Sequence, residues 1–567
     1  MNNSLPRGRA ALIAILTLAA APYFMRLGAS SLWDSNEAFY AETPREMMES
    51  GDYINPSFNY QPRFNKPPLC YWVVALLYNV FGVSETTERL AIAVAALALI
   101  AVTYHLGGKA FSVESGLLAA VGLAASPRFL MFSRRIMIDV YLAMFMSLTL
   151  LLFMLAEKYP ARRRLLLALM YASAGLGVMT KGPVAVALPG LAFIAYLALR
   201  RRLRKIREMM LPAGVTIAAA IVLPWYLAVY YQHGWHYIEA FLLKDNLSRY
   251  TQPVWGPRRG LLFYIPVIIG DLFPWSFFLA PALWLAARRR VRADAVPSPV
   301  KADREEGESR PAALLVIWVV VIVGFFSLSR SKEDLYILPA YPAASALAGG
   351  LLARFIGGES RDRREWPVTW AAVAVAATIS LAGAAVLYLF GSERLGLAGA
   401  APAGYVALAG GLISAALMIL KRRFAAIAAI ALTVITFNWV FVSRTLPDLE
   451  RFRPVRALCE VIERRASPEA LVGYYRLASP SMVFYLRRPI FEYYEREEIE
   501  RAFASGKDVY CLMTAQDYED VKGALPAATY ILASRPVFQV KLKGIFDKAD
   551  PPQIVIISNK GGTQVAQ

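Results

Sequence analysis

The sequence predicts a polytopic α-helical membrane protein with a small α/β domain at its carboxyl end. Of its 567 residues, 57% are hydrophobic, and the mean hydropathy is +0.43. Apolar runs of about 17–25 residues recur along the chain, and an α-helix needs this length to cross the hydrocarbon core of a bilayer. Most basic residues lie in short clusters between these runs. These features together predict a bundle of membrane-spanning helices.

The apolar runs predict about thirteen transmembrane helices. We place them at residues 10–28, 87–107, 111–127, 138–156, 164–180, 183–199, 211–231, 261–286, 312–329, 335–354, 367–390, 400–420 and 424–443. Residues 69–82 form a shorter, amphipathic apolar segment, which we expect to lie at the membrane interface.

The basic clusters predict the orientation of the bundle. Five of them fall in alternate loops, and positive charge is retained on the cytoplasmic side. They are Arg162–Arg164, Arg200–Lys205, Arg288–Arg290, Arg361–Arg364 and Lys421–Arg423. The first loop (29–86) and residues 445–567 then face the other side, which is the periplasm for a protein of the bacterial inner membrane.

Residues 445–567 have the composition of a soluble domain. Helix-like segments at 454–465, 480–487 and 496–505 alternate with strand-like segments at 470–475, 489–494 and 508–513, and a last strand is expected at 553–557. This alternation predicts a small periplasmic α/β domain behind a transmembrane domain of residues 1–444.

Several functional classes are not indicated. The net charge of +19 is concentrated in the clusters that set topology, so we expect no nucleic-acid partner. Three scattered cysteines favour neither a disulfide framework nor a thiolate metal site. His233, His236 and Glu239 have a spacing compatible with zinc, but the chain has only three histidines and this pair lies in an aromatic loop, so a metal is not favoured and no cofactor is expected. No phosphate-binding glycine loop indicates a nucleotide-sugar donor.

The first loop concentrates the residues that carry chemistry. Asp34 and Glu37 stand three apart, so one helical turn would point both carboxylates the same way, and either could serve as a general base. The same residues also fit a helix N-cap with an acid in the first turn.

Cations expected at the same membrane face could bind a lipid phosphate. Lys66 precedes two prolines that stiffen the chain, Arg249 offers a planar fork for phosphate oxygens, and Lys332 is expected at the same level. Any one of these alone would more often be a headgroup anchor.

At these residues the chain resembles the bacterial GT-C glycosyltransferases, in the group that contains the lipid A aminoarabinose transferase and protein O-mannosyltransferase-like enzymes. The resemblance covers about residues 10–350. Its motifs are Trp33–Met47, Lys66–Pro68 with Tyr71 and Trp72, Arg135–Asp139, Val178–Pro183, Pro224–Tyr226, Asp245–Tyr250, Pro274–Ser276 and Ser331–Pro339.

The resemblance implies a GT-C fold and inverting transfer of a sugar from a polyprenyl-phosphate donor to a periplasm-facing acceptor, such as lipid A, another glycolipid or a protein. It implies a first-loop acid, Glu37 or Asp34, as the catalytic carboxylate, with Asp139 as a second acid. The residues it implies for the lipid phosphate and the donor are Lys66, Arg249, Lys332, Tyr336, Tyr40, Arg45, Lys181 and Asp245.

The chain departs from the family pattern at three positions. Asn36 stands where relatives commonly carry Asp, which leaves open whether Asp34 or Glu37 is the base; we favour Glu37, because it keeps its place relative to Tyr40. Asn65 and Asn246 replace the Glu and His that hold a metal in some relatives.

A membrane transporter or lipid flippase is the main alternative function. Transporters place charges near the bilayer midplane between inverted repeats. Here no repeat is evident, and the acids are expected at one membrane face.

Overall fold

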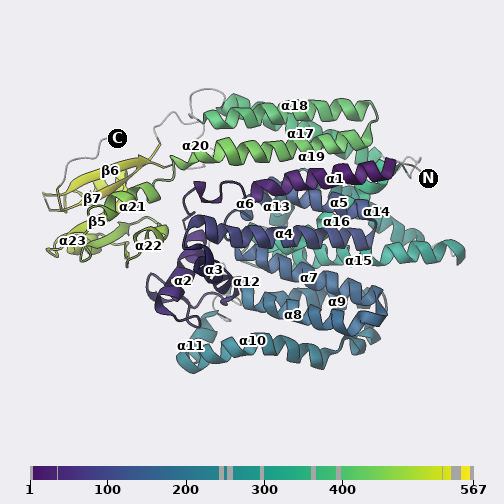
Figure 1. The fold of residues 1–567 in the computed structure, drawn as a ribbon, viewed down its shortest axis with the longest axis horizontal. Coiled ribbons are helices and arrows are strands. Elements are labelled where there is room, and N and C mark those ends of the chain that lie inside the picture. The colour runs from purple at the N-terminus through teal and green to yellow at the C-terminus, as the bar shows by residue number, and fades with distance from the viewer. Residues whose placement is uncertain are drawn as a thin grey trace.

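The computed structural model is a long helical bundle that carries a smaller sheet-containing unit at one end (Figure 1). It describes residues 4–561 apart from 35, 242–247, 252–258, 294–298, 359–365, 391–396, 527 and 538–550. Within that part of the chain, nine helices are long and apolar enough to cross a membrane, or ten if a bent pair counts as one span. The predicted polytopic helical fold is therefore confirmed.

Each predicted span coincides with helical segments of the bundle. Residues 111–127 and 183–199 form apolar helices shorter than a full span, and residues 261–286 form a pair that bends by 117°. The helices are α1 (Ser4–Ala20), α4 (Glu85–Ala110), α5 (Val113–Ala125), α7 (Ile138–Lys158), α8 (Arg163–Lys181), α9 (Val184–Leu199), α10 (Leu211–His233), α13 (Tyr264–Asp271), α14 (Ser276–Ala293), α15 (Pro299–Leu328), α16 (Tyr341–Gly357), α17 (Trp366–Phe390), α18 (Ala401–Ile419) and α19 (Arg423–Val440).

The first loop folds into its own short elements. It contains α2 (Asn36–Ser50), the antiparallel pair β1 (Ser57–Phe58) and β2 (Gln61–Pro62), and α3 (Leu69–Phe81). α3 confirms the apolar segment predicted at residues 69–82, and Figure 1 shows α2 and α3 together at one end of the bundle.

The carboxyl-terminal unit is a five-stranded sheet in the order β4-β3-β5-β7-β6. β3 pairs in parallel with β4 and β5, whereas β7 pairs antiparallel with β5 and β6. Two clusters of buried apolar residues fill the space between helices and sheet. The elements are α21 (Val455–Glu463), β3 (Leu471–Tyr475), α22 (Ser481–Leu486), β4 (Phe491–Tyr493), α23 (Arg496–Phe503), β5 (Val509–Thr514), α24 (Ala515–Val521), β6 (Tyr530–Pro536) and β7 (Gln553–Ser558). The predicted strands are present, and β6 and α24 are additional.

The carboxyl-terminal unit is bonded directly to the first loop. The backbone N–H of Leu32 donates to the Tyr485 hydroxyl at 2.7 Å, and the side chain of Asn59 exchanges two hydrogen bonds of 2.8 Å with the backbone of Ile490. These contacts fix the first loop between the bundle and the sheet.

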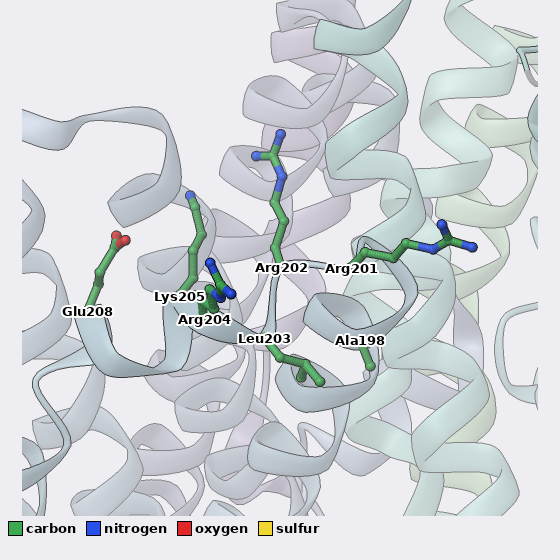
Figure 2. Close-up of a pocket in the computed structure, with 7 residues that line it drawn as sticks. All are labelled: Ala198, Arg201, Arg202, Leu203, Arg204, Lys205 and Glu208. Atoms are coloured by element: carbon green, nitrogen blue, oxygen red, sulfur yellow. The ribbon is translucent and has the colours of Figure 1, made fainter.

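The basic loop after α9 lies at the opposite end of the bundle from the first loop. Figure 2 shows a surface hollow there, with arginines and a lysine extending from η4 (Leu203–Met209) and the residues before it. Lys205 pairs with Glu157 near the end of α7 at 2.7 Å, and Arg163 at the start of α8 pairs with Glu208 at 3.0 Å. Because α7 and α8 have their other ends at the first loop, the two charged regions are separated by the length of these helices.

Candidate functional site

The centre of the candidate site is an ion pair between two helix ends. Asp139 lies in the first turn of α7 and Lys181 in the last turn of α8, and the Lys181 ammonium donates to an Asp139 carboxylate oxygen at 2.5 Å. The same ammonium lies 4.7 Å from the centre of the Tyr336 ring, in η7 (Asp334–Ala340). The structure thus brings together three predicted site residues that are distant in sequence.

Tyr40 of α2 borders this ion pair. Its ring stacks on Tyr71 of α3 with 5.7 Å between centroids, and its hydroxyl interacts electrostatically with Asp139 and Arg63. Arg63 lies over the Phe39 ring at 3.8 Å. Tyr40 of α2, Tyr71 of α3 and Arg63, which follows β2, therefore place two aromatic rings and a cation on the Asp139 side of the site.

Lys66 is positioned by an aromatic cluster beneath the first loop. Its carbonyl accepts a hydrogen bond from the buried Tyr237 hydroxyl at 3.3 Å, and its half-buried side chain follows a turn that enters α3. Phe64 packs against Tyr237 at 4.9 Å and against His233 and His236. His233 itself bonds to Asn55 at 2.7 Å, so the histidines support the Lys66 turn.

The Lys332 segment lies beside the Arg249 segment. The backbone N–H of Arg330 donates to the Tyr250 carbonyl at 3.0 Å. The Lys332 ammonium is buried and donates to the Ser329 carbonyl, so it stabilises the loop in which it lies. Arg249 is described through its backbone, in α12 (Arg249–Thr251), and Asp245 lies outside the described residues.

Glu37 is bound to the bundle by a fully buried ion pair. Its two oxygens accept from Nε and a terminal nitrogen of Arg89 at 2.8 and 3.0 Å, and one also accepts from the Trp33 backbone N–H at 2.7 Å. Glu37 is 0% exposed. Burial alone raises the pKa of Glu37, but the charge and hydrogen bonds of Arg89 outweigh it, so the pKa lies below its usual range.

Asp34 has a different environment. One carboxylate oxygen accepts from the backbone N–H of Ser481 at 3.0 Å and from its hydroxyl at 2.5 Å, while no bond to the other oxygen is seen among the described residues. Burial raises the pKa of Asp34, and the Ser481 bonds and the charge of Arg453 offset this only partly. A half-buried carboxylate with raised pKa and one open oxygen has the properties of a general base.

Arg45 is engaged by acids and a phenol near it in sequence. It bonds to Glu42 at 2.5 Å, to Glu49 at 2.7 Å and to the Tyr60 hydroxyl at 3.0 Å. On the same helix, burial raises the pKa of Glu46 to about 7, although its carboxylate accepts from Ser57 and from the Tyr60 backbone. The predicted donor contact of Arg45 stays a prediction.

Sequence reasoning missed Arg89 and Ser481, the partners of the two first-loop acids. Arg89 lies 52 residues beyond Glu37, and Ser481 lies 447 residues beyond Asp34. One signal was available for Arg89, because an arginine in the first turns of a predicted span requires a buried partner. Nothing in the sequence indicates Ser481.

The sequence of this chain is similar to those of proteins named as glycosyltransferases. Residues 65–227 match the family model described as dolichyl-phosphate-mannose-protein mannosyltransferase. A protein of Pseudomonas savastanoi pv. phaseolicola, named undecaprenyl phosphate-alpha-4-amino-4-deoxy-L-arabinose arabinosyl transferase, is 31% identical over 371 residues, which are 63% of this chain and 64% of the relative. The protein of the same name from Pectobacterium carotovorum is 28% identical over 66% of this chain and 64% of its own length. The match thus spans less than two thirds of each curated relative.

Solved structures show the same fold over nearly the whole chain. The crystal structure of ArnT from Cupriavidus metallidurans bound to undecaprenyl phosphate has a TM-score of 0.78 and 24% identity, covering 98% of this chain and 99% of that one. The archaeal oligosaccharyltransferase AglB of Archaeoglobus fulgidus, at 13% identity, has a TM-score of 0.51 over 90% of this chain and 72% of its own. The resemblance to GT-C glycosyltransferases predicted from the sequence is therefore confirmed.

Proposed function

We propose that this protein is an inner-membrane glycosyltransferase that moves a sugar from a polyprenyl-phosphate donor to an acceptor on the periplasmic side. The observation that carries the proposal is the cluster of Asp139, Lys181 and Tyr336 at the first-loop end of the bundle. The named activity of the relatives supports the same donor class, and the fold shared with an undecaprenyl-phosphate-bound structure supports the fit of such a lipid.

The proposed site has the charges that this donor requires. The donor carries its sugar on a phosphate at the membrane surface. At that surface the site has the ammonium group of Lys66, in the turn before α3, and that of Lys181, which Asp139 holds at the end of α8. Arg249 is the third proposed phosphate ligand. Cations fixed in a partly desolvated site stabilise negative charge far better than cations in water, so they assist departure of the phosphate.

The proposed reaction is a displacement at the anomeric carbon. The acceptor oxygen forms a bond to that carbon as the bond to the donor phosphate oxygen breaks, which inverts the configuration. The electron pair of the broken bond leaves with the polyprenyl phosphate, and the acceptor proton passes to a carboxylate. No nucleotide takes part, because the donor is already activated by its phosphate.

We assign the carboxylate that receives the proton to Asp34 rather than Glu37. Both Glu37 oxygens are occupied by Arg89 and Trp33, whereas Asp34 keeps one oxygen without a bond in the described structure. Asp139 is neutralised by Lys181 and holds that ammonium in place. Glu37, which the family pattern favours, then acts as the anchor of α2.

Donor binding by purified protein tests the proposal. Lys66→Ala should weaken binding of undecaprenyl phosphate by about 1.5–3 kcal/mol, the value of one charge-assisted contact. Lys158→Ala is the matched control, because Lys158 is an exposed lysine at the far end of α7 and should bind the lipid as the wild type does. Equal affinity of all three proteins for the lipid would overturn the assignment of this site.

Comparison of cells with and without the gene tests the reaction itself. Mass spectrometry of lipids and glycans should show one acceptor that lacks a sugar when the gene is deleted. A transporter or flippase would give a different result in isolated membranes. If membranes from the deletion strain are supplied with donor on both faces, every acceptor should then still be modified.

A further inference from the structure

The Trp33 ring lies against two arginines from separate parts of the chain. The guanidinium carbon of Arg135, from the loop before α7, is 3.4 Å from the ring centroid, and that of Arg453, in the link before α21, is 4.3 Å from it. Each contact is a favourable cation–π arrangement. The ring therefore gathers two cations where the bundle meets the carboxyl-terminal unit.

Both guanidinium groups keep hydrogen-bond donors that the described residues do not satisfy. Nε of Arg135 and one terminal nitrogen of Arg453 are buried without an acceptor. No described carboxylate forms an ion pair with Arg135, and the closest one to Arg453, Glu450, is 3.6 Å away. A guanidinium carries five donors, and an unmet buried donor is costly, so both groups are prepared to receive an acceptor.

The acids around this pair are at least partly engaged by other groups. Glu37 is held by Arg89 and Asp34 by Ser481, whereas one oxygen of Glu450 accepts from the Ser31 backbone at 2.8 Å and its other oxygen lies 3.6 Å from Arg453. The charged neighbours of Arg135 are the cations Arg453, Arg89 and Arg128 and the acid Glu37, and Arg453 adds the acid Glu450, so cations outnumber acids around the pair. The local charge is therefore positive, and the Arg453 side chain, 16% exposed, can still be reached from outside.

We propose that Arg135 and Arg453 form a binding site for an oxyanion, a phosphate or a carboxylate, carried by the acceptor. This inference rests on the proposed function, since it assumes an acceptor that approaches the first loop. Arg453, which lies over the Trp33 ring, is also one of the charges that act on Asp34, so an anion held at this ring brings the acceptor close to the proposed base. Lys66, the proposed donor ligand, is positioned instead by Tyr237, which follows the end of α10. The two sites thus separate acceptor from donor.

Phosphate protection of the purified protein against heat tests the site, with saturating undecaprenyl phosphate present so that the donor site is occupied. Inorganic phosphate should raise the melting temperature above that in chloride of equal ionic strength. Arg135→Gln and Arg453→Gln should each raise the phosphate Kd about tenfold or more, because each loses a charge-assisted contact. Arg451→Gln removes an exposed arginine two residues away and should leave the Kd unchanged.

Three outcomes would overturn the proposal. The first is that phosphate no longer raises the melting temperature once undecaprenyl phosphate is bound. The second is that Arg451→Gln raises the phosphate Kd as much as the two site variants do, and the third is that neither site variant changes the phosphate Kd. If a glutamine variant fails to fold, Arg453→Lys replaces it, which keeps the charge but loses the fork and should show an intermediate Kd. Failure of this experiment leaves the lipid affinity of Lys66→Ala untouched, so it is distinguishable from failure of the proposed function.

Discussion

Replacing Glu37 by Gln should damage the stability of the protein more than its chemistry. Glu37 is 0% exposed and Arg89 is 1% exposed, and they share two hydrogen bonds. Breaking a buried ion pair costs about 3–5 kcal/mol when the remaining charge is left without compensation. Arg89 keeps Glu88 at 3.5 Å and its hydrogen bonds to the carbonyls of Leu27 and Ser30, so the cost here lies at the low end of that range. Gln keeps one oxygen that can accept from Arg89 or Trp33, so we expect the free energy of unfolding to fall by about 3 kcal/mol.

Thermal denaturation in detergent measures this loss, and single-turnover transfer at matched donor occupancy measures the chemistry. Glu37→Gln should melt well below the wild type yet retain substantial transfer at low temperature. Asp34→Asn should show the reverse: its amide oxygen still accepts from Ser481, but it cannot take a proton, and loss of a general base costs about 10²–10⁴ in rate.

Glu49→Gln is the matched control for the substitution. Glu49 is on the same helix and pairs with Arg45, but its side chain is 55% exposed. An exposed pair contributes about 0–1 kcal/mol, so this variant should melt close to the wild type. A Glu37→Gln protein with wild-type stability and no transfer, beside a fully active Asp34→Asn, would refute the assignment and make Glu37 the base.

Three further predictions concern proton affinity and topology. Ser481→Ala removes a hydrogen bond from the Ser481 hydroxyl that lowers the pKa of Asp34. The pKa of Asp34 should therefore rise, and the acid limb of the pH–rate profile for transfer should move to higher pH. Ser481→Thr should restore the wild-type profile, and an unmoved acid limb in Ser481→Ala would contradict the link between Ser481 and Asp34. Burial raises the pKa of Glu46 to about 7, so the folded state binds more protons than the unfolded state between the ordinary carboxyl pKa and that value. Stability should therefore fall by at most about 3 kcal/mol as pH rises from about 4.5 to 7, and Glu46→Gln should flatten this fall in melting curves across that range. A reporter active only after export, fused after Gln567, should be active because the carboxyl-terminal unit is expected in the periplasm; activity of a cytoplasm-only reporter there would reject the orientation.

Patterns local in sequence predicted most of the fold. Apolar runs located the bundle, since the bilayer sets one length for every span. In the carboxyl-terminal unit, the alternation of helix-like and strand-like hydrophobic patterns predicted β3, α22 and β5 to within a few residues. β6 was missed because its residues, Tyr530–Pro536, mix polar and apolar side chains and end in proline.

The site was predictable only in part, because its contacts join distant segments. The Asp139–Lys181 pair spans 42 residues, yet the two helix ends it joins follow from the predicted spans, so their meeting at one face could be expected. The roles of Asp34 and Glu37 could not be separated from the sequence, because their spacing fits a general base and a helix N-cap equally well. The proposed assignment rests on their partners Arg89 and Ser481, and neither belongs to the first-loop pattern.

In the proposed assignment, the two first-loop acids have different tasks. Arg89 fixes the start of α2 to the bundle through Glu37, and the backbone of Ser481 fixes Asp34 to the carboxyl-terminal unit. Precise placement of a base requires both, since a small displacement of a catalytic group costs much of its rate. Asn36, exposed between them, can neither accept a proton nor pair with Arg89 as a charge. With Asn at this position, the proposed base must be a flanking acid held in place by groups outside the loop, and Ser481 provides this contact for Asp34.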